Sequence, residues 1–126
     1  VVTVHTPLTP ETRGMVDGRL IRLMKPTAVL VNMSRGGVVV EKDLADALRD
    51  GVLAGAALDV FETEPADPGN PLLHMDTVVA TPHCAALTRE AGERMSLQAA
   101  MGIHEVLSGA VPSWPVNFPK SGEGAR

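Results

Sequence analysis

VVATPHCAALTR, residues 78–89, changes from a strand-like to a helix-like pattern and indicates the fold class. An apolar run of strand length ends at Thr81, Pro82 fixes the backbone, and His83 stands directly before a long helical pattern. A strand, a short loop and a helix in this order are typical of an α/β protein. His83 is the best candidate for proton transfer, although a single histidine at a strand end is more often structural than catalytic.

Length and composition exclude several classes of protein. The chain has 126 residues, enough for one domain with a core, and 44% of them are hydrophobic. No apolar run approaches the roughly 18 residues of a membrane span, and no pattern of a signal peptide is present. The net charge of −4 and the scarcity of aromatic residues argue against a nucleic-acid partner. Because Cys84 is the only cysteine, no intrachain disulfide and no cysteine-based metal site can form, which fits a reducing compartment. We expect a cytoplasmic protein without a metal site.

Apolar and amphipathic patterns alternate along the chain. Four runs are predicted to be strands, at residues 1–4, 28–31, 53–58 and 78–80. Helices are predicted at residues 19–25, 41–50 and 87–107, and the acidic, proline-rich residues 62–75 are predicted to form a loop. The chain opens on a strand-like run without an initiator methionine, so we expect a piece of a longer protein. Strands that alternate with helices predict a parallel sheet with right-handed crossovers.

Polar and titratable residues follow each predicted strand: His5, then residues 32–35, then Asp59, then His83. Ligands of parallel sheets bind beyond the carboxyl ends of the strands, so these residues are expected at one rim. A carboxylate such as Glu64 beside His83 would fix the tautomer of the imidazole, and Arg35 would bind a substrate carboxylate with two donors. This set predicts interconversion of a 2-hydroxy acid and a 2-oxo acid, with the hydride supplied by a cofactor.

Four motifs in register resemble the NAD-dependent D-2-hydroxyacid dehydrogenases, which include phosphoglycerate, glycerate and hydroxypyruvate enzymes. They are HTPLTPETRGM followed by LMKPTAVLVN (residues 5–32), NMSRGGVVV (residues 32–40), AGAALDVFETEP (residues 54–65) and ATPHCAALT (residues 80–88). The resemblance covers residues 1–117. It implies an enzyme that uses NAD and acts on a small D-2-hydroxy acid or 2-oxo acid.

The same resemblance assigns roles to individual positions. Arg35 matches the arginine that holds the substrate carboxylate and carbonyl, Glu64 matches the partner of the catalytic histidine, and His83 matches that histidine. Asp59 matches the acid at the nicotinamide carboxamide. The positions implied at the cofactor are His5, Thr6, Pro7, Met33, Ser34, Arg35, Asp59, His83 and Ala85.

The implied organisation is part of a two-domain enzyme. Residues 1–86 are expected to be the C-terminal half of a doubly wound parallel-sheet (Rossmann) NAD-binding domain. Residues 87–117 are expected to return to the substrate domain, and residues 118–126 to be a loose tail. The sequence contains no G-x-G-x-x-G motif, so the pyrophosphate half of the cofactor site is not in it. A homodimer is implied for the full-length protein.

Two departures from the family pattern and two alternatives accompany this interpretation. Val40 stands where an aspartate is common, which removes a helix N-cap worth about 1 kcal/mol. Cys84, Ala85 and Ala86 stand where glycines are common, which bears on the fit around the nicotinamide or on substrate preference. The chain could instead belong to a nucleotide-sensing binding module, as in the C-terminal-binding co-repressors that resemble these enzymes, or be an inactive fragment of the same fold.

Overall fold

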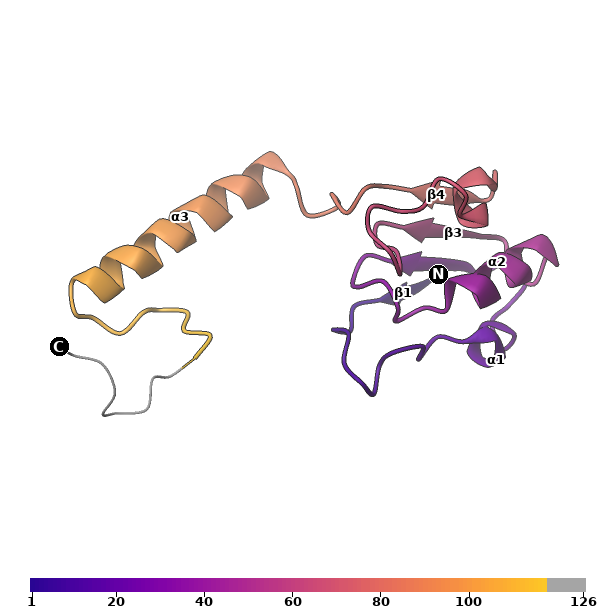
Figure 1. Ribbon diagram of the computed structural model, residues 1–126, viewed down its shortest axis with the longest axis horizontal. Helices are drawn as coiled ribbons and strands as arrows, with labels where there is room; N and C mark the ends of the chain where they lie inside the picture. The colour runs from indigo at the N-terminus through magenta and orange to yellow at the C-terminus, as the bar shows by residue number, and fades with distance from the viewer. Residues whose placement is uncertain (118–126) are drawn as a thin grey trace. The chain divides into compact units, whose positions relative to one another are not determined.

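The computed structural model describes residues 1–117. The described chain divides into two compact units, the first at Val1–Ala85 and the second beginning at Ala86. The first unit holds, in chain order, β1 (Val2–Val4), α1 (Gly18–Ile21), β2 (Val29–Asn32), α2 (Glu41–Arg49), β3 (Gly55–Leu58), the 3₁₀ helix η1 (Pro71–His74) and β4 (Val78–Ala80) (Figure 1). The second unit holds α3 (Arg89–Leu107).

The four strands form one parallel sheet in the order β1-β2-β3-β4. Leu30 of β2 pairs with Val2 on one side and with Ala56 on the other, and Ala56 in turn pairs with Val78. The carboxyl ends of all four strands therefore lie at the same edge of the sheet. The predicted α/β fold with a Rossmann-type parallel sheet is confirmed.

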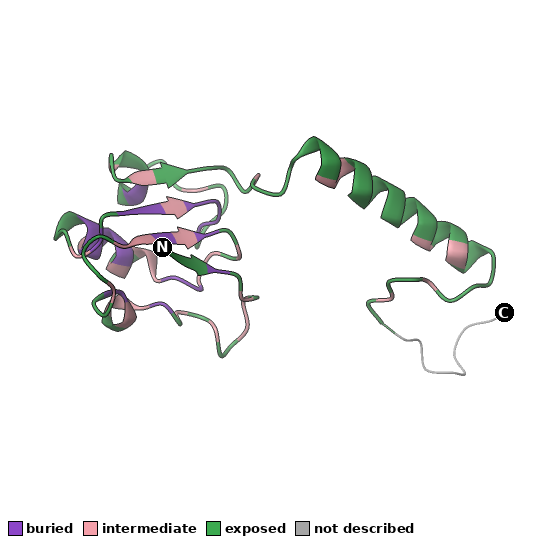
Figure 2. Cartoon of the chain, turned by 180° about the vertical axis from the view of Figure 1, so that it is seen from behind, coloured by how far each residue is buried: buried purple, intermediate pink, exposed green. Residues whose placement is uncertain are grey.

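The core of the first unit lies on one face of the sheet. Leu30 lies between less buried neighbours in β2, and Ala56 and Leu58 lie on either side of a less buried residue in β3. All three are nearly inaccessible to solvent, in the buried part of the sheet (Figure 2). From α2, Leu44 points to the same core and is fully buried, which contributes about 1.5–3 kcal/mol to stability. Leu72 of η1 is also fully buried, so the segment before β4 is anchored to this core.

Several predicted boundaries differ from the structure. The strand predicted at residues 53–58 is Gly55–Leu58, and the helix predicted at residues 87–107 begins at Arg89. The helix predicted at residues 19–25 covers only Gly18–Ile21, because the chain continues in turns after Ile21. Leu23, a candidate for the core in the predicted helix, is 78% exposed. The predicted loop at residues 62–75 contains η1. Asn70 begins η1 by accepting a hydrogen bond from the Leu72 amide at 3.0 Å, which is a local capping signal inside a polar stretch.

The second unit contains one long helix and the segment that follows it. The Thr88 hydroxyl caps α3 by accepting from the Ala91 amide at 3.1 Å, and no residue of α3 is buried. After α3, the amide and hydroxyl of Ser113 each donate to the Glu105 carboxylate at 2.7 Å, which ties residues 111–117 back to the helix. The predicted tail, residues 118–126, lies outside the described residues. Across residues 1–117, no helix combines the length and apolar character that a membrane crossing needs.

Candidate active site

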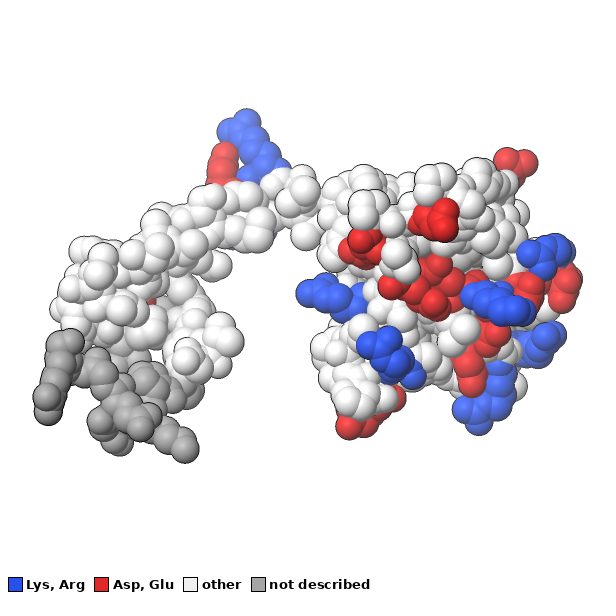
Figure 3. All heavy atoms as spheres, in the orientation of Figure 1, with Lys and Arg blue, Asp and Glu red and all other residues white. Residues whose placement is uncertain are grey.

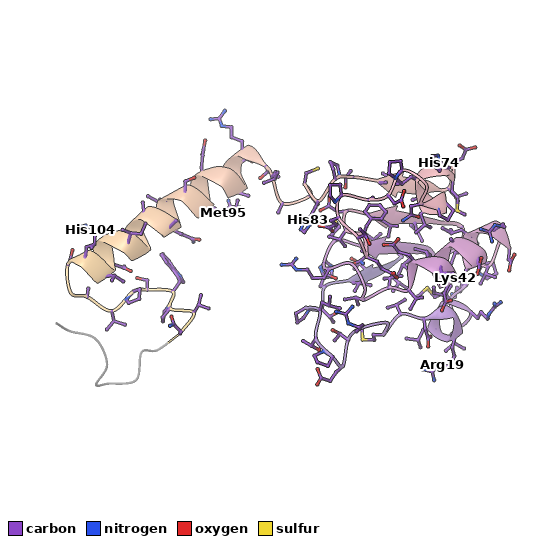
Figure 4. All side chains as sticks on the ribbon, in the orientation of Figure 1. Arg19, Lys42, His74, His83, Met95 and His104 are labelled. Atoms are coloured by element: carbon purple, nitrogen blue, oxygen red, sulfur yellow. The ribbon has the colours of Figure 1, made fainter. Side chains whose placement is uncertain are left out.

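The His83 ring and the Glu64 carboxylate form the only close histidine–carboxylate pair within residues 1–117. His83 Nδ1 lies 2.7 Å from Glu64 Oε2, and His83 lies at the edge of the first unit where β4 ends (Figure 4). The other oxygen of Glu64, Oε1, accepts a hydrogen bond from the Phe61 amide at 3.1 Å. Each oxygen of the carboxylate therefore has a fixed partner.

This environment keeps Glu64 ionised. The hydrogen bond with His83 and then the Phe61 amide hold the pKa of Glu64 below its ordinary value, and the positive charge of Arg35 adds to the effect. An ionised carboxylate can only accept, so His83 Nδ1 carries the hydrogen of this bond. His83 Nε2 is then the ring nitrogen left for a ligand.

The backbone of His83 is held in an uncommon conformation. Its φ is 52°, in the left-handed region that non-glycine residues rarely occupy. The Asp59 carboxylate accepts the amides of the next two residues, Cys84 at 2.8 Å and Ala85 at 3.0 Å. Asp59 thus fixes the chain on the carboxyl side of His83, while Glu64 fixes the ring.

Asp59 is itself a buried carboxylate, with a residue exposure of 4%. Burial acts to raise the pKa of Asp59, but hydrogen bonds from the Thr81 hydroxyl at 2.6 Å and from the Ala85 and Cys84 amides outweigh it and hold the pKa below its ordinary value. Asp59 therefore stays charged at neutral pH. This charge lies at the carboxyl end of β3, next to the backbone that presents His83.

The Arg35 loop is built around a buried amide. Asn32 Oδ1 accepts from the amide and hydroxyl of Ser34, at 3.1 and 2.9 Å, and Asn32 Nδ2 donates to the Arg35 carbonyl at 3.1 Å. The Arg35 guanidinium is exposed and donates to the Ser34 carbonyl at 2.7 Å. Within residues 1–117 no hydrogen bond or ion pair joins Arg35 to His83 or Glu64, although its charge lowers the pKa of Glu64.

A pocket of about 640 Å³ adjoins the histidine–carboxylate pair. Its titratable groups come from Asp59, Glu64 and His83, and most of its surface is apolar. The lining residues are Asp59, Phe61, Glu64, Pro65, Ala66, Leu73, Ala80, Thr81, Pro82 and His83. The structure thus gathers three of the predicted site residues in one pocket, whereas Arg35, His5, Thr6, Pro7, Met33, Ser34 and Ala85 lie outside its lining.

The rim after β1 contains an unsatisfied hydroxyl. Thr6 Oγ1 is buried and has no hydrogen-bond partner among residues 1–117. The neighbouring His5 ring is exposed and bonded to the Thr3 hydroxyl at 2.8 Å. A buried hydroxyl without a partner is costly unless a ligand supplies one, so Thr6 fits a polar group of a bound cofactor.

Other polar groups contribute less to a site. In the described part of the chain, no cluster of three or more His, Cys, Asp or Glu side chains has the geometry to bind a metal ion. His74 is exposed and bonded to the Pro68 carbonyl at 2.7 Å, and Cys84 is a free thiol. Acidic and basic side chains are interspersed on the face of the first unit seen in Figure 3, so that face carries no continuous basic patch.

Residues 1–85 match the family model described as D-isomer specific 2-hydroxyacid dehydrogenase, NAD binding domain. The chain belongs to the D-isomer specific 2-hydroxyacid dehydrogenase family. A glyoxylate reductase of Thermofilum pendens is 47% identical over 117 residues, which are 93% of this chain and 34% of the relative. A D-3-phosphoglycerate dehydrogenase of Methanocaldococcus jannaschii is 46% identical over 118 residues, 94% of this chain and 22% of the relative. The chain therefore spans about a third or less of the length of these curated relatives.

A solved structure of the family shares the fold. The NAD complexed form of a D-isomer specific 2-hydroxyacid dehydrogenase from Lactobacillus delbrueckii ssp. bulgaricus matches with a TM-score of 0.83 and 32% identity. The match covers 92% of this chain and 39% of that one. Because identity and fold agree over nearly the whole chain, the parallel sheet described above is that of the family's NAD-binding domain.

Several contacts that shape the site were not predicted from the sequence. Asn32 orders the Arg35 loop, Thr81 donates to Asp59, and the Phe61 amide holds Glu64. Asn32 was expected at the rim, and its role could have been found, because an asparagine that ends a buried strand requires partners for its amide. The Phe61 contact is made by a backbone group and leaves no signal in the side-chain sequence.

Proposed function

We propose that this chain carries the acid/base half of an NAD-dependent D-2-hydroxyacid dehydrogenase. The observation that carries the proposal is the 2.7 Å contact between His83 Nδ1 and Glu64 Oε2 at the carboxyl edge of a parallel sheet. In such sheets ligands bind at this edge. The proposed substrate is a small 2-hydroxy acid or the corresponding 2-oxo acid, which the named activities of the relatives support.

The proposed roles follow from the charges and hydrogen bonds of the pocket. His83 Nε2 takes the hydroxyl proton during oxidation and returns a proton to the carbonyl oxygen during reduction. Glu64 stays ionised, orients the ring through Nδ1 and stabilises the imidazolium when it forms. Arg35, at the rim beside this pair, binds the substrate carboxylate with its planar set of donors.

The cofactor supplies the hydride acceptor or donor, which no side chain can provide. The residues proposed to hold it are those predicted at the ends of the strands: His5, Thr6, Pro7, Met33, Ser34, Arg35, Asp59, His83 and Ala85. The orphan hydroxyl of Thr6 and the buried charge of Asp59 fit a ligand that offers both hydrogen-bond donors and acceptors. The NAD complex of the Lactobacillus relative supports NAD as this ligand.

Replacement of His83 by Gln in the full-length protein tests the proposal. We expect kcat for reduction of glyoxylate or hydroxypyruvate to fall at least about 100-fold, because general acid/base catalysis contributes 10²–10⁴ in rate, with NADH binding nearly unchanged. His74→Gln is the matched control, since His74 is exposed and lies outside the pocket. Turnover retained by His83→Gln would contradict the assignment. NADH binding without reduction of any 2-oxo acid by the wild type would favour the binding-module alternative.

The finer organisation is also part of this proposal. Residues 1–86 are proposed to contribute half of the NAD-binding domain and residues 87–117 to return toward a substrate domain. The homodimer and the cytoplasmic location stay predictions from the resemblance and the composition.

A further inference from the structure

The segment between β3 and β4 carries Glu64, and a second pair of glutamates attaches it to the start of α2. Glu62 Oε1 accepts a hydrogen bond from the Glu41 amide at 2.9 Å. In return, Glu41 Oε1 accepts from the Glu62 amide. Each side chain thus binds the backbone of the other residue, and the two segments are joined at residues 21 positions apart in the sequence.

The second oxygen of Glu41 binds the far end of the same segment. Asn70 Nδ2 donates to Glu41 Oε2 at 2.6 Å, while Asn70 Oδ1 accepts from the Leu72 amide and begins η1. Leu72 is fully buried, so this end is fixed to the core. One carboxylate therefore holds residues 62 and 70, and Glu64 lies between them.

The first turn of α2 gains a hydrogen bond from this arrangement. Glu41 is the first residue of α2, and the amide of a first helical residue has no partner within the helix. Glu62 supplies that partner from a distant segment. The first turn of the helix and the segment that carries Glu64 thus complete each other's hydrogen bonds.

We propose that Glu41 is a positioning residue, which keeps Glu64 in contact with His83 by holding residues 62–70 against the start of α2. The inference rests on the proposed function, because it assigns Glu41 to the acid/base reaction. Glu41 touches neither the ring of His83 nor the pocket lining. Its effect is exerted through the backbone on either side of Glu64.

The test uses Glu41→Ala and Glu41→Gln in the full-length protein, with Asp43→Ala as the matched control. Asp43 lies in the same first turn of α2 and also accepts a backbone amide, that of Gly18 at 2.7 Å, but this contact leads to α1, which carries no site residue. Measurements are kcat, KM for the 2-oxo acid, the Kd of NADH, the melting temperature and amide hydrogen exchange at residues 61–64.

We expect Glu41→Ala to speed hydrogen exchange of the Glu62 amide. It should lower kcat about 10-fold, because small displacements of catalytic groups have large effects on rate. The Kd of NADH should change less than about twofold. Glu41→Gln keeps one oxygen for the Glu62 amide and should recover most of kcat; it also serves if the alanine variant does not fold. Asp43→Ala should lower the melting temperature without lowering kcat.

Faster exchange in Glu41→Ala with wild-type kcat would overturn the positioning role, because the contacts would then be merely structural. An equal loss of kcat in Asp43→Ala would also overturn it. If the wild-type protein reduces no 2-oxo acid, the proposed function fails. The exchange data then still test whether Glu41 holds the segment of residues 62–70. Unchanged exchange of the Glu62 amide in Glu41→Ala would overturn the positioning role as well.

Discussion

Gly36 is the position where one added methyl group perturbs the candidate site most directly. An ideal Cβ at Gly36 would lie 1.7 Å from the carbonyl oxygen of Phe61 and 2.2 Å from its carbonyl carbon. Real Cβ contacts essentially never fall below 3.0 Å, so Gly36→Ala must separate the two backbones by about 1.3 Å. Both contacts are with main-chain atoms, which cannot rotate away as a side chain can.

The two backbones separated in this way carry or hold two charged residues of the proposed site, Arg35 and Glu64. Arg35 immediately precedes Gly36, and the Phe61 amide holds Glu64 Oε1 at 3.1 Å. A displacement of about 1 Å in a catalytic constellation costs on the order of 100-fold in rate. Overpacking of this kind also destabilises the fold by about 1–3 kcal/mol. We therefore expect Gly36→Ala to lose both activity and stability.

The assay is steady-state reduction of a 2-oxo acid by NADH together with thermal unfolding of the full-length protein. Gly69→Ala is the control in the neighbouring polar segment, because its Cβ would meet only the Asp67 side chain, at 3.3 Å. We expect the control to keep wild-type kcat and nearly the wild-type melting temperature. Wild-type kcat and melting temperature in Gly36→Ala would refute the claim that these segments are in tight backbone contact.

Two further variants test the buried polar groups of the rim. Asp59→Asn should destabilise the protein by about 1–3 kcal/mol at pH 7, because a neutral amide cannot accept from all three donors. The pKa of Asp59 is lower in the folded than in the unfolded state. The ionised carboxylate therefore stabilises the fold fully above the unfolded pKa of about 3.9, and this stabilisation is lost as the pH falls through the folded pKa. The difference in free energy of unfolding between wild type and variant, measured in urea, should shrink below about pH 4. Asn32→Ala should lower the free energy of unfolding by about 1–3 kcal/mol in the same assay, because it removes the hydrogen-bond partners of Ser34 and of the Arg35 carbonyl. An unchanged urea midpoint would contradict this.

The sequence was sufficient to predict the sheet and the edge at which its polar residues lie. The apolar runs before His5, Asn32, Asp59 and His83 form four parallel strands, because short apolar runs between amphipathic segments are typical of a parallel sheet covered by helices. Polar residues directly after such runs must lie at one edge once the strands are parallel. This argument needs no side-chain geometry, which is why it succeeded from composition and order alone.

The contacts that hold the site together could not be predicted in the same way. The absence of a side-chain cap at Val40 is confirmed. The acceptor of the Glu41 amide, Glu62, is 21 residues away in the sequence and has no local signal. The closeness of Gly36 to Phe61 likewise depends on two loops whose approach is set by the whole sheet. Local patterns encode elements and caps, whereas contacts between loops depend on the register of distant strands.

The backbone conformation of His83 also depends on contacts with residues distant in the sequence, Glu64 and Asp59. A non-glycine residue at a φ of 52° costs on the order of 1 kcal/mol, and nothing in the tripeptide Thr81-Pro82-His83 itself requires that value. The cost is met by contacts on both sides: the ring is held by Glu64, and the following amides are held by the buried charge of Asp59. If either carboxylate were neutral, the chain could relax toward an ordinary φ and the ring would leave its partner. The geometry of the proposed acid/base residue therefore depends on two ionised carboxylates, one that touches the ring and one that binds only the backbone.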